Sequence, residues 1–231
     1  MSAVLSRKTK AVLKASNSRG WVLEPETKQL LAAAGFIVPR YRWARDLEAA
    51  LQAGEEIGYP VVGKIVSPEI IHKSDAGGVV LGIGSESALR KVFKRFSKIE
   101  GFSGMLVEET VSGIELIVGA KSDYQFGPVI LVGIGGVGVE VYQDTSIRMA
   151  PITERDVTSM IKGLKAHKLV EGYRGAAPIH METLTRMLIQ FSEWVMELEG
   201  YFESIDLNPV MCSRTDCTVA DARIILKGSD F

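Results

Sequence analysis

The hydrophobic and polar positions along the chain follow two periods, and each period predicts one type of element. In three segments apolar residues recur every three to four positions, as on the buried face of a helix. Asp46 and Ser85 stand where a side chain caps the first turn of a helix, and Gly35 stands where a helix ends. Together with two later helical segments, the pattern predicts helices over residues 24–35, 46–57, 85–99, 153–170 and 181–199.

Short apolar runs predict strands between these helices. The alternation of residues 115–121 suits an antiparallel sheet beside residues 128–134. Further strands are expected over residues 36–43, 60–66, 78–83, 105–109, 201–206 and 218–226. Along the chain, helix–strand units come first and an antiparallel meander follows. The last part contains helices and a closing pair of strands. This order favours an α+β fold over a doubly wound sheet, with a lobe boundary at residues 108–113.

The composition excludes several classes of protein. The 27 basic and 28 acidic residues leave a net charge of −1, without the basic excess expected of a nucleic-acid-binding protein. No apolar stretch approaches the roughly 20 residues that span a bilayer, and the first ten residues lack the apolar core of a secretory signal. The two cysteines, Cys212 and Cys217, therefore suggest a reduced, cytoplasmic setting. Their spacing is not that of a zinc site.

His72 is the first candidate for chemistry. It lies in a loop with Gly77 and Gly78, a few residues after an apolar run that contains Lys64. A lysine charge, glycine amides and an imidazole nucleophile are what phosphate chemistry requires. Each residue also has a simpler interpretation, because a loop histidine is often solvated and a strand lysine can extend to water. The basic residues Lys91, Lys94, Arg95 and Lys98 are interpreted as a solvated helix face.

Carboxylates and amides supply the second set of candidates. Glu108 and Glu109 end a strand, so their side chains point to opposite faces and one can face a ligand. Asp206 and Asn208 share a strand face, and Asp221 follows on the next strand, a set of oxygens that suits Mg²⁺. The glycine-rich run 133–140 has neither Rossmann nor P-loop spacing and is either a turn or an anion nest.

Taken together, these motifs resemble the ATP-grasp subunit of nucleoside-diphosphate-forming acyl-CoA synthetases. The similarity runs from about residue 24 to the end. It rests on Pro-Val-Val-Gly-Lys (60–64), Ile-His-Lys-Ser-Asp-Ala-Gly-Gly-Val (71–79), Val-Glu-Glu (107–109), Gly-Ile-Glu-Leu-Ile-Val-Gly (113–119), Phe-Gly-Pro-Val-Ile (126–130), Gly-Ile-Gly-Gly (133–136), Asp144, Arg-Met-Ala-Pro (148–151), Tyr-Arg-Gly-Ala (173–176), Asp-Leu-Asn-Pro (206–209) and Val-Ala-Asp-Ala-Arg (219–223). Tyr173 departs from the pattern, in which Met or Leu is common.

The resemblance implies a role for each candidate. His72 corresponds to a phosphorylated histidine on a moving loop, and Asp206 to the carboxylate beside it. Asn208 and Asp221 resemble Mg²⁺ ligands. The nucleotide, ATP or ADP, would then be held by four groups. Gly77 and Gly78 belong to the loop, and Lys64 binds the phosphates. The hinge 108–111, with Glu108, Glu109 and Val111, binds adenine, and Glu115 binds the ribose.

The resemblance also implies an architecture and a partner. The expected fold is a single ATP-grasp domain over residues 1–231, with the nucleotide bound between two α+β lobes, residues 21–107 and residues 108–231 plus 1–20. The chain resembles a separate β subunit of an ADP-forming acetyl-CoA synthetase. An α subunit would then carry the CoA-binding and ligase domains, in an assembly that the family suggests is α2β2. The net reaction implied converts acyl-CoA, ADP and phosphate into acid, ATP and CoA.

Two alternatives stay open at this stage. In a β subunit of the succinyl-CoA-ligase type, the partner's histidine alone would carry the phosphoryl group. In a nucleotide-sensing subunit, ATP would bind without turnover. The presence of His72 argues against both, since neither needs a nucleophile on this chain. The acyl group and the preference for ADP or GDP are not determined by the motifs.

Overall fold

The computed structural model describes residues 5–136, 144–173 and 177–228, and the chain divides into two compact units. The larger comprises Met1–Val38 and Ser112–Phe231, and the smaller Pro39–Val111. These bounds differ from the expected lobes, which assigned residues 21–38 to the first lobe. The physical reason is that β1 (Trp21–Val22) pairs with β11 (Ala222–Leu226), so this segment belongs to the sheet of the larger unit.

The larger unit is built on a seven-stranded sheet. Its order is β1-β11-β9-β6-β7-β8, with β10 also paired to β9, and all these pairs are antiparallel. The remaining strands are β6 (Ile114–Asp123), β7 (Gly127–Ile134), β8 (Thr145–Met149), β9 (Phe202–Cys212) and β10 (Cys217–Val219). The predicted antiparallel meander and α+β class are confirmed. The closing segment is longer than expected and forms three strands.

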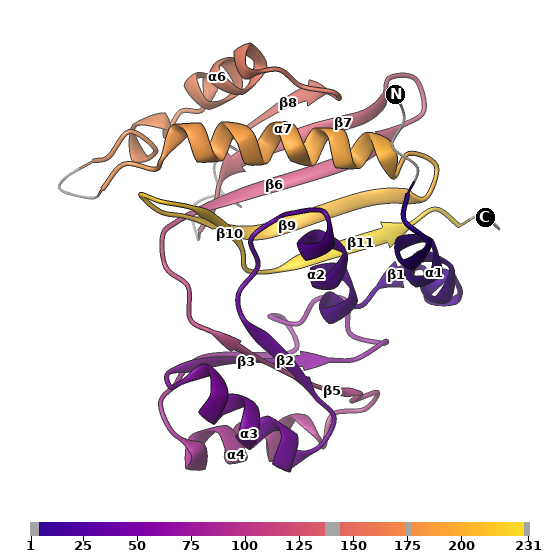
Figure 1. Ribbon diagram of the computed structural model, residues 1–231, viewed down its shortest axis with the longest axis vertical. Helices are drawn as coiled ribbons and strands as arrows, with labels where there is room; N and C mark the ends of the chain where they lie inside the picture. The colour runs from indigo at the N-terminus through magenta and orange to yellow at the C-terminus, as the bar shows by residue number, and fades with distance from the viewer. Residues whose placement is uncertain (1–4, 137–143, 174–176, 229–231) are drawn as a thin grey trace. The chain divides into compact units, whose positions relative to one another are not determined.

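The helix α7 (Met181–Glu197) lies along this sheet (Figure 1). Its buried residues recur at helical spacing and enclose the main core with the sheet, among them Leu184, Leu188, Phe191 and Val195. The opposite face of the sheet carries the alternate, more polar positions of β6 and β9, because successive side chains of a strand point to opposite faces.

The expected continuous helix over residues 153–170 is wrong. The structure has α6 (Glu154–Gly163), which begins with a capping box between Thr153 and Asp156, and a short 3₁₀ turn at His167–Leu169. Leu164 is extended between them. Buried Asp144 explains the break, because its carboxylate accepts the backbone N–H groups of Lys165 and Ala166 at 2.7 and 2.8 Å.

The N-terminal part of the larger unit adds elements that the pattern did not predict. These are α1 (Arg7–Ser16), a 3₁₀ turn at Asn17–Arg19 and β1, while β8 is a further unpredicted strand. The predicted helix is confirmed as α2 (Glu24–Ala33), and Gly35 follows it with φ +89°, the left-handed conformation expected at a helix end.

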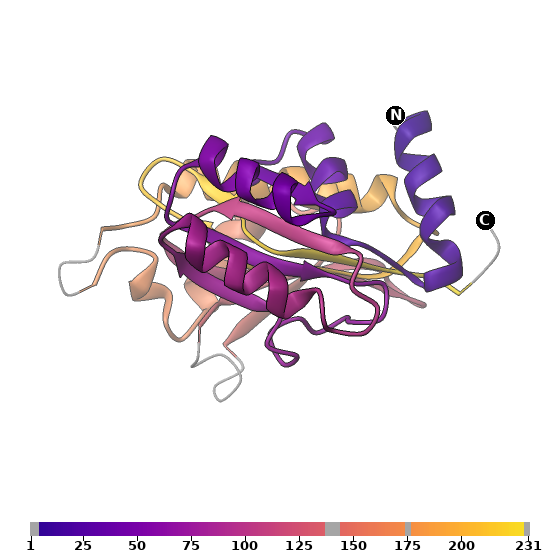
Figure 2. The same cartoon turned by 90° about the horizontal axis from the view of Figure 1, so that it is seen from below.

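The smaller unit is a four-stranded antiparallel sheet with two helices side by side on one face (Figures 1 and 2). The strand order is β2-β5-β3-β4, with β2 (Tyr41–Ala44), β3 (Val61–Val66), β4 (Val79–Ile83) and β5 (Gly104–Glu109). The helices are α3 (Leu47–Ile57) and α4 (Glu86–Phe96), and Asp46 and Ser85 cap them as predicted. Within the described residues, no helix is long and apolar enough to cross a bilayer.

Candidate functional site

Lys64 and Glu108 form a buried ion pair in the smaller unit. Lys64 Nζ lies 3.1 Å from Glu108 Oε2, and the two side chains are 7% and 2% exposed. β3 and β5 align Lys64 with Leu106 and Val62 with Glu108, which places all four on the sheet face opposite the helix-covered core. Burying an ammonium is costly without an anion, so Glu108 keeps the charge of Lys64 in place on this face.

Glu109, the next residue, points to the other side and is held by Arg40. The Arg40 side chain and backbone N–H both donate to its carboxylate, at 2.7 and 2.8 Å. Burial acts to raise the pKa of Glu109, but the hydrogen bonds and charge of Arg40 outweigh it and hold the pKa below its usual value. Glu109 is therefore an anchored carboxylate at the end of β5.

The His72 loop connects β3 to β4. His72 is exposed, and its carbonyl accepts from Ala76 N–H at 3.3 Å, while Gly78 N–H donates to Lys73 O at 2.7 Å. Gly77 has φ +64°, a conformation that favours glycine. Gly78 packs so closely on Ile65 that a side chain at this position would clash. The loop thus requires both glycines for its shape and presents the histidine at the surface.

Arg95 supports this loop from α4. Its guanidinium donates to the carbonyl of Gly77 at 3.0 Å. The sequence predicted that the basic face of α4 is only solvated. This prediction is wrong for Arg95, which contacts the loop. The helical spacing gave no signal of this contact, because the partner is a backbone carbonyl in a loop 18 residues away in the sequence.

The other two histidines have structural positions. His167 Nδ1 lies 2.9 Å from Leu164 O in the turn after α6. His180 is the N-cap residue of α7 and accepts from Thr183 N–H through Nδ1 at 3.3 Å. Both serve local structure. They can therefore serve as controls for His72, which is exposed on the loop between β3 and β4.

The larger unit brings Asp206, Asn208 and Asp221 together. The backbone N–H of Asn208 donates to the carbonyl of Asp221 at 3.1 Å, where β9 meets the start of β11. Asp206 lies opposite Arg223, whose guanidinium reaches its carboxylate at 3.1 Å. Arg223 ends the quoted motif Val-Ala-Asp-Ala-Arg. The register of β9 and β11, which the two motifs do not specify, brings these residues opposite each other.

This donor set fits Mg²⁺ bound together with a nucleotide. Asn208 is exposed and Asp221 is partly exposed, so both side chains can reach solvent and ligand. Among the described residues, no group of three or more His, Cys, Asp or Glu forms a complete metal cage. Mg²⁺ does not require one, because it is held by one or two protein oxygens while phosphates and water complete its shell.

Glu115 lies near the start of β6, beside the glycine-rich run. Its backbone carbonyl accepts from Gly135 N–H at 2.6 Å, and a side chain on Gly135 would clash with Glu115. The run therefore packs closely against β6 as far as Gly136. Residues 137–140, and Arg174–Ala176 of another quoted motif, lie outside the described residues.

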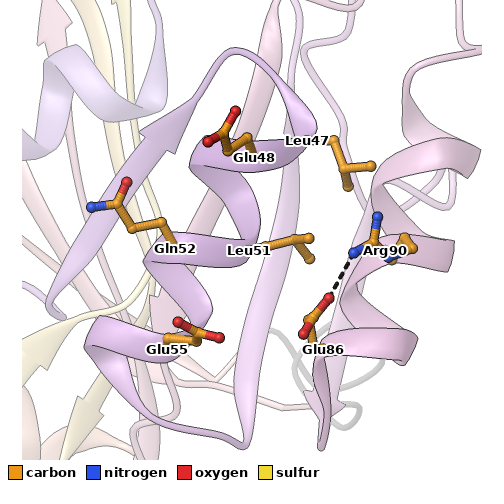
Figure 3. Close-up of a pocket in the computed structure, with 7 residues that line it drawn as sticks. All are labelled: Leu47, Glu48, Leu51, Gln52, Glu55, Glu86 and Arg90. Atoms are coloured by element: carbon orange, nitrogen blue, oxygen red, sulfur yellow. Dashed lines mark hydrogen bonds and ion pairs between the residues drawn. The ribbon is translucent and has the colours of Figure 1, made fainter.

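Two surface grooves lie away from the candidate residues. One, of about 610 Å³, lies between α3 and α4 and is lined by Leu51, Glu55 and the Glu86–Arg90 ion pair (Figure 3). The other, of about 570 Å³, lies between α6 and α7. Their linings contain no candidate residue from the described chain, so neither groove is taken as the functional site.

The chain matches the model of the ATP-grasp domain over residues 13–226. It is 40% identical to the β subunit of ADP-forming acetate–CoA ligase II of Pyrococcus furiosus, over 92% of this chain and 94% of that one. A longer relative, ADP-forming acetate–CoA ligase I of Archaeoglobus fulgidus, is 40% identical over 90% of this chain and 31% of its own length. The succinate–CoA ligase β subunit of Haloarcula marismortui matches over 51% of this chain and 32% of its own.

The fold resembles that of solved acetyl-CoA synthetases. The dinucleotide-forming acetyl-coenzyme A synthetase 1 of Ca. Korarchaeum cryptofilum, in complex with coenzyme A, Ca-AMPCP and HgCl⁺, superposes with a TM-score of 0.89 and 39% identity, covering 96% of this chain and 100% of that one. A second structure of that enzyme contains coenzyme A and Mg-AMPPCP, with its phosphohistidine segment pointing towards the nucleotide-binding site. It superposes with a TM-score of 0.83 and 39% identity over 95% and 100% of the two chains.

Proposed function

Because the chain belongs to the family of ATP-grasp β subunits of ADP-forming acetate–CoA ligases, we propose that it transfers a phosphoryl group between His72 and a magnesium-bound nucleotide. The complete enzyme would convert acyl-CoA, ADP and phosphate into acid, ATP and CoA. The observation that carries this proposal is His72 itself, exposed on a glycine-shaped loop within the matched domain. The Korarchaeum relative has a phosphohistidine segment directed at nucleotide.

The proposed step uses His72 as a covalent carrier. A phosphoryl group on an imidazole nitrogen is attacked by the terminal phosphate oxygen of ADP, so that a P–N bond breaks and a P–O bond forms. The imidazole is regenerated and ATP is released. Such transfers depend mainly on alignment and charge neutralisation. A histidine on a connecting loop suits this role, because a loop can move while the strands that hold the nucleotide stay fixed.

We propose nucleotide-binding groups in each unit. In the smaller unit we assign Lys64 to the phosphates, the loop shaped by Gly77 and Gly78 to the transferred phosphoryl group, and residues 108–111 to the base. The Lys64–Glu108 pair supports this assignment, since Glu108 holds a buried ammonium on the sheet face opposite the two helices. In the larger unit we assign Glu115 to the ribose.

Asn208 and Asp221 are the proposed Mg²⁺ ligands. When bound, the ion would neutralise phosphate charge. The support from this chain is the backbone hydrogen bond that holds the two residues side by side. Asp206 lies on β9 and pairs with Arg223 on the neighbouring strand β11. It is assigned to orient the imidazole that exchanges the phosphoryl group.

The proposed reaction requires a partner subunit. We propose that both subunits are cytoplasmic. The Pyrococcus relative is a β subunit of similar length, and this chain matches only 31% of the longer Archaeoglobus relative. The remaining length of such relatives would correspond to an α subunit that binds CoA and forms the acyl phosphate. We propose an α2β2 assembly with that subunit.

Labelling with γ-labelled ATP and Mg²⁺ tests the role of His72. The wild-type chain should acquire an acid-labile, base-stable label, the signature of a phosphohistidine. His72→Asn should abolish the label and ATP formation, while Mg·ADP affinity stays nearly unchanged. His167→Asn and His180→Asn are matched controls and should retain the label, because both residues serve local structure.

The same variants separate this proposal from the succinyl-CoA-ligase type. A His72→Asn complex that makes ATP at a rate near wild type would show that His72 is a bystander. In that case the partner's histidine alone carries the phosphoryl group. The match to the succinate–CoA ligase subunit covers half of this chain, against about nine-tenths for the acetate–CoA ligase subunit, which favours the first mechanism.

Calorimetry tests the metal site. Asp221→Asn should weaken Mg·ADP binding by about tenfold, the loss of one charged ligand, and should affect metal-free ADP less. Glu203→Gln is a matched control on β9, because Glu203 is exposed and is not assigned to the site. Unchanged Mg·ADP affinity in Asp221→Asn would exclude Asp221 as a ligand.

A further inference from the structure

The two cysteines of the chain face each other inside the larger unit. β9 and β10 place Cys212 directly opposite Cys217, and the two residues are 1% and 3% exposed. Both are free thiols, and their sulfurs are in direct contact. The proposed phosphoryl transfer uses neither residue.

The backbone around the pair has the geometry of a cross-strand disulfide. Ser213 N–H donates to Asp216 O at 2.8 Å and closes the hairpin between β9 and β10. Hydrogen-bonded and non-hydrogen-bonded pairs alternate along an antiparallel ladder, so the adjacent Cys212–Cys217 pair is the non-hydrogen-bonded type. Such pairs have Cα atoms about 4.5 Å apart, within the range of roughly 4.4 to 6.8 Å that disulfides span. A bond between the sulfurs therefore needs no rearrangement of the strands.

This hairpin also anchors both places where the chain leaves the larger unit. The chain leaves it after Val38 and returns at Ser112. Just before the first crossing, Ile37 O accepts from Val219 N–H at 2.9 Å, next to β10. Just after the second, Gly113 packs on the backbone of Cys212 and Ile114 pairs with it. A covalent link between β9 and β10 would therefore fix the attachment point of both crossings.

We propose that Cys212 and Cys217 are a redox site that forms a reversible disulfide across the β9–β10 hairpin. The oxidant is a small disulfide such as oxidised glutathione. One cysteine attacks it, forming a mixed disulfide and releasing one glutathione thiol. The second cysteine loses its proton, attacks the sulfur of the first and releases the second glutathione. Two protein thiols thus become one disulfide while one glutathione disulfide becomes two thiols, and the reverse exchange restores them.

The surroundings of the two sulfurs determine the rate and the pH dependence of this exchange. The hydrogen bond with Cys217 and then burial raise the pKa of Cys212 far above its usual value. Either sulfur can make the first attack, because the two cysteines face each other across the strands. Because both sulfurs are buried, the hairpin must open for that attack. Oxidation should be slow and should accelerate as pH rises.

The test compares disulfide formation in the folded and the unfolded chain. The full chain is equilibrated in glutathione redox buffers, without denaturant and in unfolding urea, then trapped in acid, alkylated and weighed as an intact protein. The folded chain should form the intramolecular disulfide with an effective concentration about tenfold or more above that of the unfolded chain, because the strands align the sulfurs. A folded value equal to or below the unfolded one, or mixed glutathione adducts alone, overturns the proposal.

Two further measurements separate a hairpin link from general oxidation. Cys217→Ser cannot form the intramolecular link and should yield a glutathione adduct only. In the wild type, oxidation should slow hydrogen exchange at Thr218 and Val219, while Cys217→Ser treated in the same buffer should show no change. Equal exchange in oxidised and reduced wild type contradicts the proposed link. The result does not depend on phosphoryl transfer, so it stands or fails apart from the proposed function.

Discussion

At the scale of single residues, this protein keeps its most deeply buried charges in pairs. Lys28 is fully buried, 3.1 Å from Glu24 and 2.8 Å from the carbonyl of Ala220, the residue before Asp221. Lys64 and Glu108 form the second such pair. A buried ammonium without a partner is costly because the interior has a low dielectric constant. Removing one partner of such a pair should therefore destabilise the protein more than replacing both partners by apolar residues.

Lys28→Met should destabilise the larger unit by about 3 kcal/mol, because it leaves the Glu24 carboxylate buried without its cation. The double variant Glu24→Leu with Lys28→Met should recover part of this loss, since no buried charge then remains. Urea unfolding curves of the single and double variants give the comparison. A single variant as stable as wild type would show that the pair does not stabilise the fold.

The Arg40–Glu109 pair predicts a pH dependence. The folded pKa of Glu109 lies below its unfolded value, so its stabilising contribution is present above the unfolded pKa and is lost as pH falls through the folded one. Arg40→Ala should raise the pKa of Glu109 in a carboxyl NMR titration and move acid unfolding to higher pH. Arg42→Ala is the matched control, because Arg42 pairs with Glu56 at 3.2 Å instead. A Glu109 pKa that does not change in Arg40→Ala contradicts this account.

At the scale of elements, the smaller unit joins two strands of its sheet through the His72 loop. β3 and β4 fix the two ends of the His72 loop, and α4 contributes one contact through Arg95 to Gly77. The helix itself is fixed by Leu89, Phe93 and Phe96 in the core. α4 is therefore a stable support from which a single side chain restrains the loop.

Arg95→Ala should loosen the loop without unfolding α4. Hydrogen exchange at Gly77 and Gly78 should accelerate by about fivefold, equivalent to one hydrogen bond of about 1 kcal/mol. Labelling of His72 should change in rate, while Mg·ADP affinity is retained. Lys94→Ala removes a neighbouring exposed charge and should leave exchange unchanged. Equal exchange in both variants would show that the Arg95 contact does not restrain the loop.

At the scale of the whole molecule, the chain matches one family model, that of the nucleotide-binding ATP-grasp domain. The ATP-grasp match covers residues 13–226, nearly the full length. The longer Archaeoglobus relative contains much more chain than this one. Acid and CoA chemistry is accordingly assigned to a second subunit, and phosphoryl transfer to this one.

The isolated chain should therefore show no acyl-CoA synthetase activity with acetyl-CoA, ADP and phosphate. Addition of the α subunit should produce ATP, measured by a coupled assay. His72→Asn with the same α subunit is the control and should stay inactive, although the α subunit's own histidine should still be phosphorylated from acetyl-CoA and phosphate. Full activity of the purified chain alone would contradict the division of labour.

The sequence by itself determined the elements with strong local periodicity and the identity of the family. α3, α4 and α7 follow from apolar residues at helical spacing. Asp46 caps α3 and Ser85 caps α4 through contacts three residues away. The ATP-grasp resemblance rested on motif order, which is fully contained in the sequence. Such features need no knowledge of distant partners, because the interacting groups are neighbours in the chain.

Only the tertiary structure decided the features that depend on distant partners. β1 and β8 have weak local patterns and exist through pairing with β11 and β7. The break after α6 depends on Asp144, the boundary at Val38 on β1, and the pairs Lys64–Glu108 and Asp206–Arg223 on strand register. Register also converts two nearby cysteines into a facing pair. In each case the deciding interaction joins residues that the order of the chain alone does not bring into contact.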